Sequence, residues 1–333
     1  MSMMMEVPNT SIGERMHRFW FRPISATGFG LMRIAFGMTT MLNLLLVRDV
    51  LRFYGPEGIL PRHMAKELLR QEWRFSLIDT VGAGGTLLLY LLLWTSLLFV
   101  TLGIRTRLAL LISLVLLYSF HEYGAILRDS GDMLSNTIGF ILLLAPCDRA
   151  CTLQHLRHRL VHSAAKPVRT LPPPRTIPIW PYRLLLWQVA VMYMSSAYGK
   201  ISGAAWPEGW AVAVATHHVH FARFPTAFAD WLARFSPFLS TFVVYTQLGW
   251  GLLLTMGLLN IMQCSFNTKN VKRILLFNGL LIHGGIFLIM DMGVFSFAVF
   301  TAYLGLLLDE DLTAIKKLLL CFCHAHPRDR NIM

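Results

Sequence analysis

Long runs of apolar residues, separated by short polar stretches, repeat along the whole chain. An α-helix needs about 20 such residues to cross the bilayer core. We predict a helix in each of eight runs: 24–47, 86–104, 108–127, 133–146, 184–199, a span within 235–268, 274–290 and 292–308. The runs at 133–146, 274–290 and 292–308 are short for a complete crossing.

The stretch from Trp206 to Arg223 has a different character. It is too polar to span a membrane and too apolar to remain in water, which is typical of an interfacial or re-entrant amphipathic helix. The predicted fold is therefore all-α: a polytopic membrane helix bundle of about eight transmembrane helices, with an interfacial or re-entrant segment after helix five.

Composition supports a membrane location. Of the 333 residues only 14% are charged, and the mean hydropathy is +0.53. Soluble domains carry about 25% charged residues, so the chain is predicted to be an integral membrane protein whose first partner is the lipid bilayer. The formal net charge of +12 reflects topology, because cytoplasmic loops collect Lys and Arg. We expect no nucleic acid partner.

Loop charges orient the predicted helices. The loop 147–183 holds seven basic residues against one acid, Asp148, so we place it in the cytoplasm. With eight crossings both termini are then cytoplasmic. The chain divides into a cytoplasmic segment 1–23, a transmembrane domain 24–308 and a cytoplasmic tail 309–333. The basic loop from Arg48 to Arg74 is an exception on the outside. Pro172 to Pro174 predict a stiff linker within the inner loop. We expect a multi-pass protein of the bacterial plasma membrane.

Cysteine and histidine clusters suggest metal sites only weakly. All five cysteines fall on the predicted cytoplasmic side and are expected to be reduced thiols. The tail residues Cys321, Cys323, His324 and His326 could bind a metal, but four potential ligands crowded into a free tail more often bind nothing. His217, His218 and His220 lack an evident further ligand, so we predict no metal site.

Lys200 is the candidate for chemistry, because it ends the apolar run 184–199 and so lies at a bilayer boundary. A lysine there can be an interfacial anchor that reaches to water. An amine in a partly apolar site can also lose its proton and act as a base.

Other polar residues lie in or beside the apolar runs. Arg33, Glu122 and His283 either line a polar cavity or, for the first two, form an ion pair that locks two helices. Asp129 and Asp132 precede the fourth helix, where they can cap it or exchange a proton with Lys200 on the same side.

Several short motifs follow one another in an order that resembles a known family. The sequence has Lys200, Trp206, Glu208 and Gly209, then His218 and Phe221. His283 is followed by Gly293, Phe295 and Ser296, in the pattern H-x9-G-x-F-S. The first helix contains Arg33-Ile34-Ala35-Phe36-Gly37, and Leu102-Gly103-Ile104-Arg105 follows the second. Over residues 24–308 the chain resembles the horizontally transferred transmembrane (HTTM) domain, the membrane domain of vitamin K-dependent γ-carboxylase.

The resemblance implies a site on the extracytoplasmic face. Lys200 would be the base that deprotonates a reduced quinone such as vitamin K hydroquinone, with His218, His283 and Asp132 as further catalytic residues. Around the position of Asp132 the carboxylase carries a histidine, within the sequence Asn-Asn-His-Ser-Tyr. Arg33, Trp206 and Gly209 would bind the cofactor.

The resemblance leaves the activity open. One hypothesis is a lysine-base enzyme with carboxylase-like chemistry that acts on a quinone-type or peptide substrate. The alternative is a non-catalytic maturation or immunity partner of a secreted peptide. A transporter is disfavoured, because the sequence shows no inverted repeat. We further expect the outer ends of the first, fourth, fifth and seventh helices to form a cavity around Lys200, covered by the stretch from Trp206 to His220.

Overall fold

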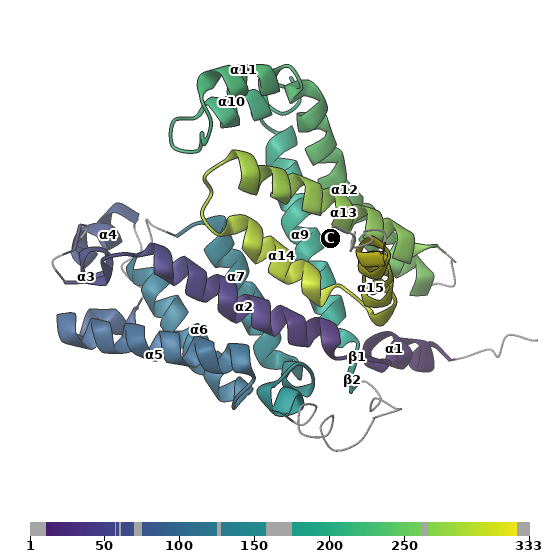
Figure 1. Cartoon of the computed structure of the whole chain (residues 1–333), viewed down its shortest axis with the longest axis horizontal. Coiled ribbons are helices and arrows are strands. Elements are labelled where there is room, and N and C mark those ends of the chain that lie inside the picture. Colours follow the sequence, from purple (N-terminus) through teal and green to yellow (C-terminus); the bar gives the residue numbers. More distant parts are fainter. Residues whose placement is uncertain are drawn as a thin grey trace, which may run out of the picture.

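The computed structural model describes residues 11–324 except 57, 60, 70–74, 125–127, 158–174 and 262–265. The proline linker and His326 lie outside these residues, as do the side chains of Cys321, Cys323 and His324. The fold is all-α (Figure 1), apart from two short paired strands.

Each of the eight apolar runs coincides with a helix. These helices are α2 (Thr27–Leu46), α5 (Ala83–Leu102), α6 (Thr106–Tyr123), α7 (Ser130–Leu144), α9 (Trp180–Ile201), α12 (Ser236–Ile261), α13 (Thr268–Ile289) and α14 (Phe295–Gly305). Within the described residues α2, α5, α12 and α13 are long and apolar enough to cross a membrane. These four helices indicate a membrane protein.

Shorter elements flank and connect the long helices. They are α1 (Ile12–Phe21), β1 (Pro23–Ser25), α3 (Val50–Tyr54), α4 (Arg62–Leu69), η1 (Leu77–Thr80), η2 (Cys147–Arg149), β2 (Thr176–Pro178), α10 (Ala211–His217), α11 (Thr226–Ala233) and α15 (Asp309–His324). The strands β1 and β2 pair antiparallel, with Ile24 opposite Ile177. This pairing holds the beginnings of α2 and α9 at the same end of the bundle.

Two of the helix boundaries differ from the predicted ones for local reasons. The helix α9 begins at Trp180, four residues before the apolar run, because Pro181 fits the first turn of a helix, where no backbone N–H is needed. The helix α14 has only 11 residues, since the chain leaves α13 after Ile289 and turns at Gly293, whose φ is +54°.

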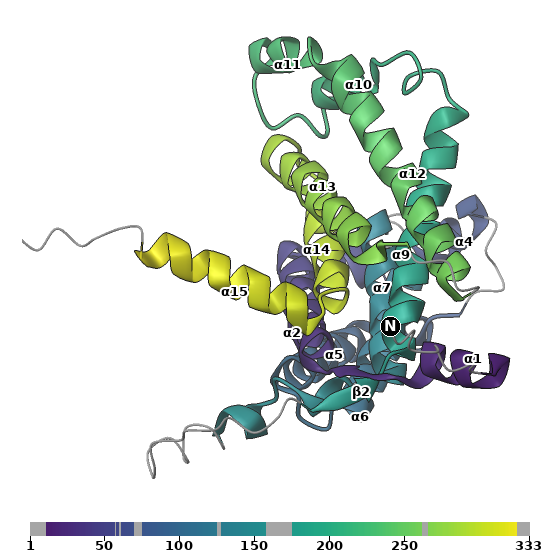
Figure 2. The same cartoon turned by 90° about the vertical axis from the view of Figure 1, so that its right-hand side faces the viewer.

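The arrangement separates the helices into two groups (Figures 1 and 2). The helices α2, α5, α6 and α7 pack against one another, and α14 joins them through α2 and α7. The helices α9, α12 and α13 form the second group, with α10 and α11 at its far end. The core between the groups is built from large buried side chains such as Phe29, Met32, Leu185 and Trp250.

Candidate functional site

A cavity of about 1110 Å³ lies between the two groups of helices. Side chains of α7, α9, α12 and α13 form its walls, and Phe295 of α14 contributes as well. Trp206, α10 and Leu232 of α11 line the same cavity. Most lining residues are Leu, Ile, Val, Met and Phe, so the space suits an apolar ligand.

Lys200 lies in the wall of this cavity, near the end of α9. Its ammonium nitrogen donates a hydrogen bond to Ser196 Oγ at 2.6 Å, and it lies 4.9 Å from the centre of the Trp206 ring. Among the described residues no carboxylate comes within ion-pair distance of Lys200, and of the two roles predicted for Asp129 and Asp132 the structure shows helix capping. The amine therefore borders an apolar space without a counter-ion.

His283 of α13 lines the cavity and belongs to a buried hydrogen-bond chain. Its Nε2 lies 2.9 Å from the hydroxyl of Tyr193, and that hydroxyl also hydrogen-bonds the Tyr303 hydroxyl. The indole of Trp250 stacks on both tyrosine rings. No hydrogen-bond partner among the described residues reaches His283 Nδ1. The chain thus fixes one ring nitrogen of His283 and leaves the other unused.

The spacing of the late motif has a structural reason. Gly293 adopts a left-handed conformation that lets the chain reverse between α13 and α14. The reversal places the Phe295 ring 5.3 Å from the imidazole of His283. The Ser296 hydroxyl donates to the backbone carbonyl of His283 at 2.8 Å. Phe295 and Ser296 after the turn therefore hold His283 in place.

The segment after α9 contributes Trp206 directly and Gly209 indirectly. Gly209 has φ +83°, and its carbonyl accepts hydrogen bonds from the hydroxyls of Ser236 and Ser240, so it shapes the start of α12. His218 does not line the main cavity; its exposed ring stacks on Phe221 at 4.8 Å. It lines a smaller hollow of about 350 Å³ that shares Trp206 with the main cavity.

Arg33 and Asp132 lie outside the cavity lining. The buried guanidinium of Arg33 donates to the carbonyls of Val100, Thr101, Ala150 and Cys151 at the other end of the bundle. Of the two roles predicted for Arg33, the structure shows neither: backbone carbonyls hold its guanidinium away from the cavity, and Glu122 pairs with Arg128. Because α7 begins at the cavity and ends near this cluster, its 15 residues separate the two sites by roughly 20 Å.

Asp132 has a capping and bridging role instead. It completes a capping box with Asp129 and accepts a hydrogen bond from Asn43 at 2.8 Å. Its carboxylate also lies 3.5 Å from His121 Nε2. Glu122 is bonded to Arg128 at 3.0 Å. These contacts tie the ends of α2, α6 and α7 together on the side of α7 away from Lys200.

The expected set of cavity helices needs one correction. The fourth, fifth and seventh helices, α7, α9 and α13, line the cavity as expected, but the first helix, α2, does not. The sixth helix, α12, takes that place with Phe242 and Gln247, because α12 packs along α9 whereas α2 packs against α5 and α14. Among the residues that the structure describes, no three His, Cys, Asp or Glu side chains group as metal ligands do.

Sequence reasoning missed Tyr193 and Gln247. Tyr193 and Ser196 precede Lys200 by seven and four residues, which places all three on one face of a helix, and this spacing could have singled out Tyr193. Gln247 is buried in the cavity wall, and its amide oxygen has no partner within the described part of the chain. Its position in a long uncharged run offers no comparable signal.

The packing behind His283 can be tested at Gly279. A methyl group at this position of α13 would overlap the Tyr303 hydroxyl, so we expect Gly279→Ala to displace Tyr303 and to cost about 1–3 kcal/mol of stability. Gly284→Ala is the matched control, because nothing lies within 4 Å of a methyl group there. Thermal unfolding in detergent measures both variants. Equal midpoints for the two would contradict the packing described.

The contact between α10 and α11 should depend on pH. His217 Nδ1 faces the Ala213 carbonyl at 2.7 Å, and its Nε2 faces Asp230 at 2.9 Å. Hydrogen bonds to the Ala213 carbonyl and to Asp230 raise the pKa of His217 above its ordinary 6.5. The raised pKa means that this contact stabilises fully below pH 6.5 and is lost as pH rises through the higher value.

We therefore expect α10 to expose the cavity more at high pH, by a modest amount because both side chains are partly exposed. The measurement is the alkylation rate of a cysteine introduced at Ala215, relative to the same cysteine in a His217→Gln background. The ratio should rise with pH, and a constant ratio would count against the contact.

No protein-family model matches the chain, and no curated protein or solved structure matches it either. The HTTM resemblance of the motifs therefore stays a prediction.

Proposed function

We propose that this membrane protein binds an amphiphilic, quinone-type substrate in the cavity and that Lys200 is the base that accepts a proton from the substrate. The observation that carries the proposal is an amine in the wall of a large apolar cavity with no carboxylate beside it. A carboxylate within 4–6 Å would hold the amine in its charged form, and its absence among the described residues favours proton exchange with a ligand.

The shape and polarity of the cavity fit such a ligand. Small-molecule sites are mostly apolar spaces of about 300–1,000 Å³ with a few placed polar groups. This cavity, at about 1110 Å³, is of similar size and mostly apolar, and its polar lining groups include Lys200, His283 and Gln247. A reduced quinone supplies an acidic hydroxyl on an apolar ring system. The face of Trp206 beside Lys200 gives such a ring a surface for stacking.

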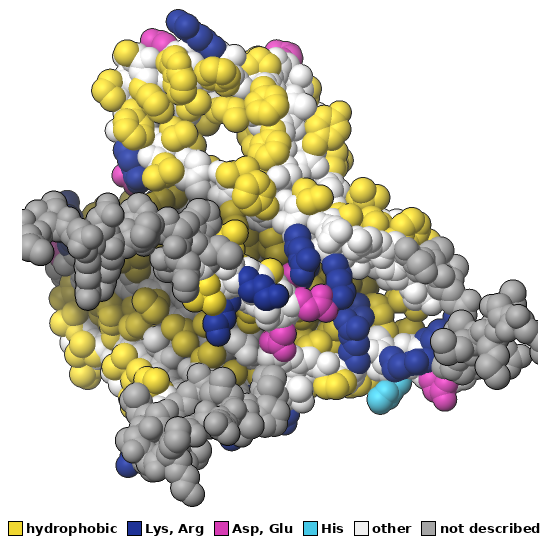
Figure 3. Space-filling view, turned by 45° about the vertical axis from the view of Figure 1, so that its right-hand side comes forward, with side chains coloured by type: hydrophobic (Ala, Val, Ile, Leu, Met, Phe, Trp, Pro, Cys, Tyr) yellow, Lys and Arg dark blue, Asp and Glu magenta, His cyan; other side chains and the backbone are white. Residues whose placement is uncertain are grey.

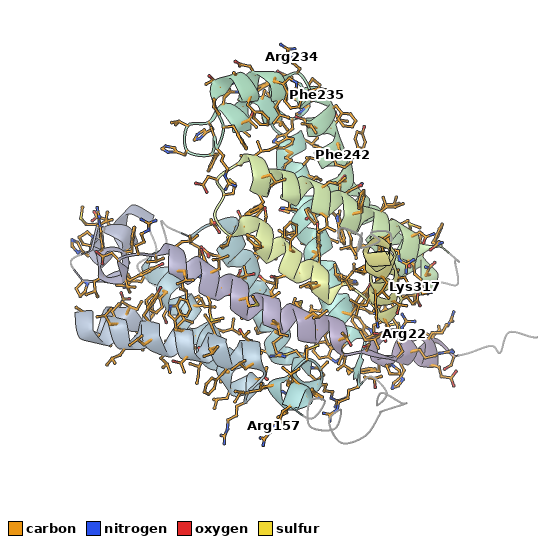
Figure 4. All side chains as sticks on the ribbon, viewed as in Figure 1. Arg22, Arg157, Arg234, Phe235, Phe242 and Lys317 are labelled. Atoms are coloured by element: carbon orange, nitrogen blue, oxygen red, sulfur yellow. The ribbon has the colours of Figure 1, made fainter. Side chains whose placement is uncertain are left out.

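The proposal includes the finer topology. All eight long helices would cross the membrane, with the cavity opening toward the extracytoplasmic side. The β1–β2 pairing supports an even number of crossings between α2 and α9, since it joins their beginnings at one end. Figure 4 shows Arg234 at the end with α11 and Arg157 at the opposite end, as two faces of a membrane protein require.

A second candidate function is that of a non-catalytic protein that binds a secreted peptide. The smaller hollow is lined by His218, Phe221 and Trp206, and the side chains of His218 and its neighbours are exposed at the α10–α11 end. An exposed aromatic hollow of about 350 Å³ suits a peptide side chain. A protein that only binds a peptide would not need the amine of Lys200, and this distinguishes the two candidates.

Filling the cavity tests the proposed function. Ile286 of α13 lines the cavity, so Ile286→Trp should reduce binding of radiolabelled 2-methyl-1,4-naphthoquinone at least tenfold. Phe277→Trp is the control, because Phe277 lies on the same helix, outside the lining and 61% exposed. Equal binding by the wild type and Ile286→Trp would show that the ligand does not use the cavity.

A further inference from the structure

The helix α1 has an apolar face that the bundle leaves uncovered. None of its residues is buried, and Ile12 and Met16 are 72% and 40% exposed. At 100° per residue, Ile12 and Met16 share one side of the helix, whereas Glu14 and Arg18 lie opposite. This pattern is typical of a helix that lies in a membrane interface.

The basic residues around this face have no acidic partners among the described residues. Arg15, Arg18 and Arg22 make no ion pair there, because Glu14 is used by the capping box with Ser11. The helix is also held in place. Arg183 donates to the Phe19 carbonyl at 2.6 Å, and its guanidinium lies 3.4 Å from the centre of the Phe19 ring.

The helix α15 repeats this combination. Two of the three acids in its first turn are used internally: Glu310 pairs with Lys269 at 2.9 Å, and Asp311 with Lys272 at 2.6 Å. Burial opposes ionisation of Asp311, but hydrogen bonds from Lys272, the Leu308 backbone and Arg273 outweigh it and lower the pKa of Asp311. Glu310 and Asp311 therefore do not neutralise the exposed cations farther along the helix, Lys316 and Lys317, which lie beside exposed Ile315 and Leu318.

Both helices project from the same end of the bundle. Figure 2 shows α15 extending from one side and α1 from the other, across the direction of the long helices. Arg22 and Lys317 are labelled at this end in Figure 4, far from Arg234. Lys and Arg side chains gather on this face, with a smaller number of Asp and Glu side chains among them (Figure 3).

From this arrangement we propose that α1 and α15 lie in the headgroup region of the membrane leaflet at this end and bind anionic phospholipids. An interfacial leaflet covers an apolar helix face, and anionic headgroups pair with the uncompensated cations. A soluble acidic partner would satisfy the charges but would need to reach two helices that extend to opposite sides of the bundle. The proposal does not depend on the chemistry assigned to Lys200.

The test places a fluorescent probe on α1 in the full-length protein. Single cysteines replace Met16 on the apolar face or His17 on the polar face, the native cysteines being substituted, and each carries a nitrobenzoxadiazole label. The protein is reconstituted in phosphatidylcholine vesicles and titrated with doxyl-labelled phosphatidylglycerol or doxyl-labelled phosphatidylcholine. We expect the probe at residue 16 to be quenched more strongly than that at residue 17.

Quenching at residue 16 should require about fivefold less phosphatidylglycerol than phosphatidylcholine for each cation that contributes. Replacing Arg15 and Arg18 by Gln should bring the two curves together, whereas Arg234→Gln, at the opposite end, should not. Equal quenching by both lipids in the wild type would overturn the preference for anionic lipid. A probe quenched by neither lipid would overturn the proposal and place α1 in water. A probe shielded only at high protein density would overturn it in favour of a contact with a second copy of the chain.

Discussion

Replacing Arg33 by Leu should lower the thermal midpoint of the protein in detergent by roughly 5–15 °C. The guanidinium satisfies carbonyls at the end of α5 and in the segment after α7, at Val100, Thr101, Ala150 and Cys151. These carbonyls lose a charged donor in the variant, and each buried orphan costs about 1–3 kcal/mol. Partial relaxation leaves a net loss of about 3–5 kcal/mol.

Two further variants make this result specific. Arg33→Lys keeps the charge but not the planar fork, and should be destabilised to an intermediate degree because one ammonium group cannot reach both pairs of carbonyls. Arg48→Leu removes an exposed arginine just after the same helix and should change stability by less than about 0.5 kcal/mol. A wild-type midpoint for Arg33→Leu would show that the carbonyl cluster does not stabilise the fold.

Substitution of Lys200 by Arg should abolish activity while leaving membrane insertion intact. Arginine keeps the positive charge and can still donate to Ser196, but it does not deprotonate in proteins and cannot act as a base. Loss of a general base lowers a rate by about 10²–10⁴-fold. The measurement is the protein-dependent oxygen consumption by a reduced naphthoquinone, since its anion reacts with oxygen faster than the neutral form.

The control for this substitution is Lys269→Arg. Lys269 forms an exposed pair with Glu310 and lies outside the cavity lining, so its replacement should leave the rate unchanged. Full activity in Lys200→Arg would assign Lys200 to anchoring or to charge, and the base role would be dropped.

The apolar runs were sufficient to locate the long helices, because membrane-spanning helices must bury their backbone polar groups and expose apolar side chains over their whole length. The pattern could not show that α12, and not α2, lines the cavity. That choice depends on which helices pack together, and the exposed apolar surfaces of α2 and α12 look alike from composition alone.

The partners of Arg33 show the same limit. A charged group in an apolar helix needs an internal partner, and this much is predicted from the sequence. The carbonyls that accept hydrogen bonds from Arg33, however, belong to residues 67 to 118 positions away. Gly103 makes room for this contact, since a methyl group there would lie 2.9 Å from Arg33 Nη1. The backbone carbonyl of any residue can accept a hydrogen bond, so the sequence does not reveal which carbonyls hold Arg33. The glycine, in contrast, is visible in the sequence.

Of the site residues that the motifs predicted, Lys200, Trp206 and His283 line one cavity. Arg33, Asp132 and His218 lie outside its lining. The three lining residues lie within or just after helices whose positions the apolar pattern determines. Tyr193 lies inside an apolar run, and its helical spacing to Lys200 marks it in the sequence, but only the structure shows that its hydroxyl meets His283.

The most direct test of the central claim is the absorption spectrum of 2-methyl-1,4-naphthohydroquinone bound anaerobically at neutral pH to the wild type and to Lys200→Met. The methionine variant keeps an unbranched side chain, one atom shorter, and removes both the base and the charge. If the amine in the cavity takes a proton from the ligand, the wild type should show the spectrum of the anion and Lys200→Met that of the neutral hydroquinone. The same neutral spectrum in both proteins, with binding retained, would contradict the account.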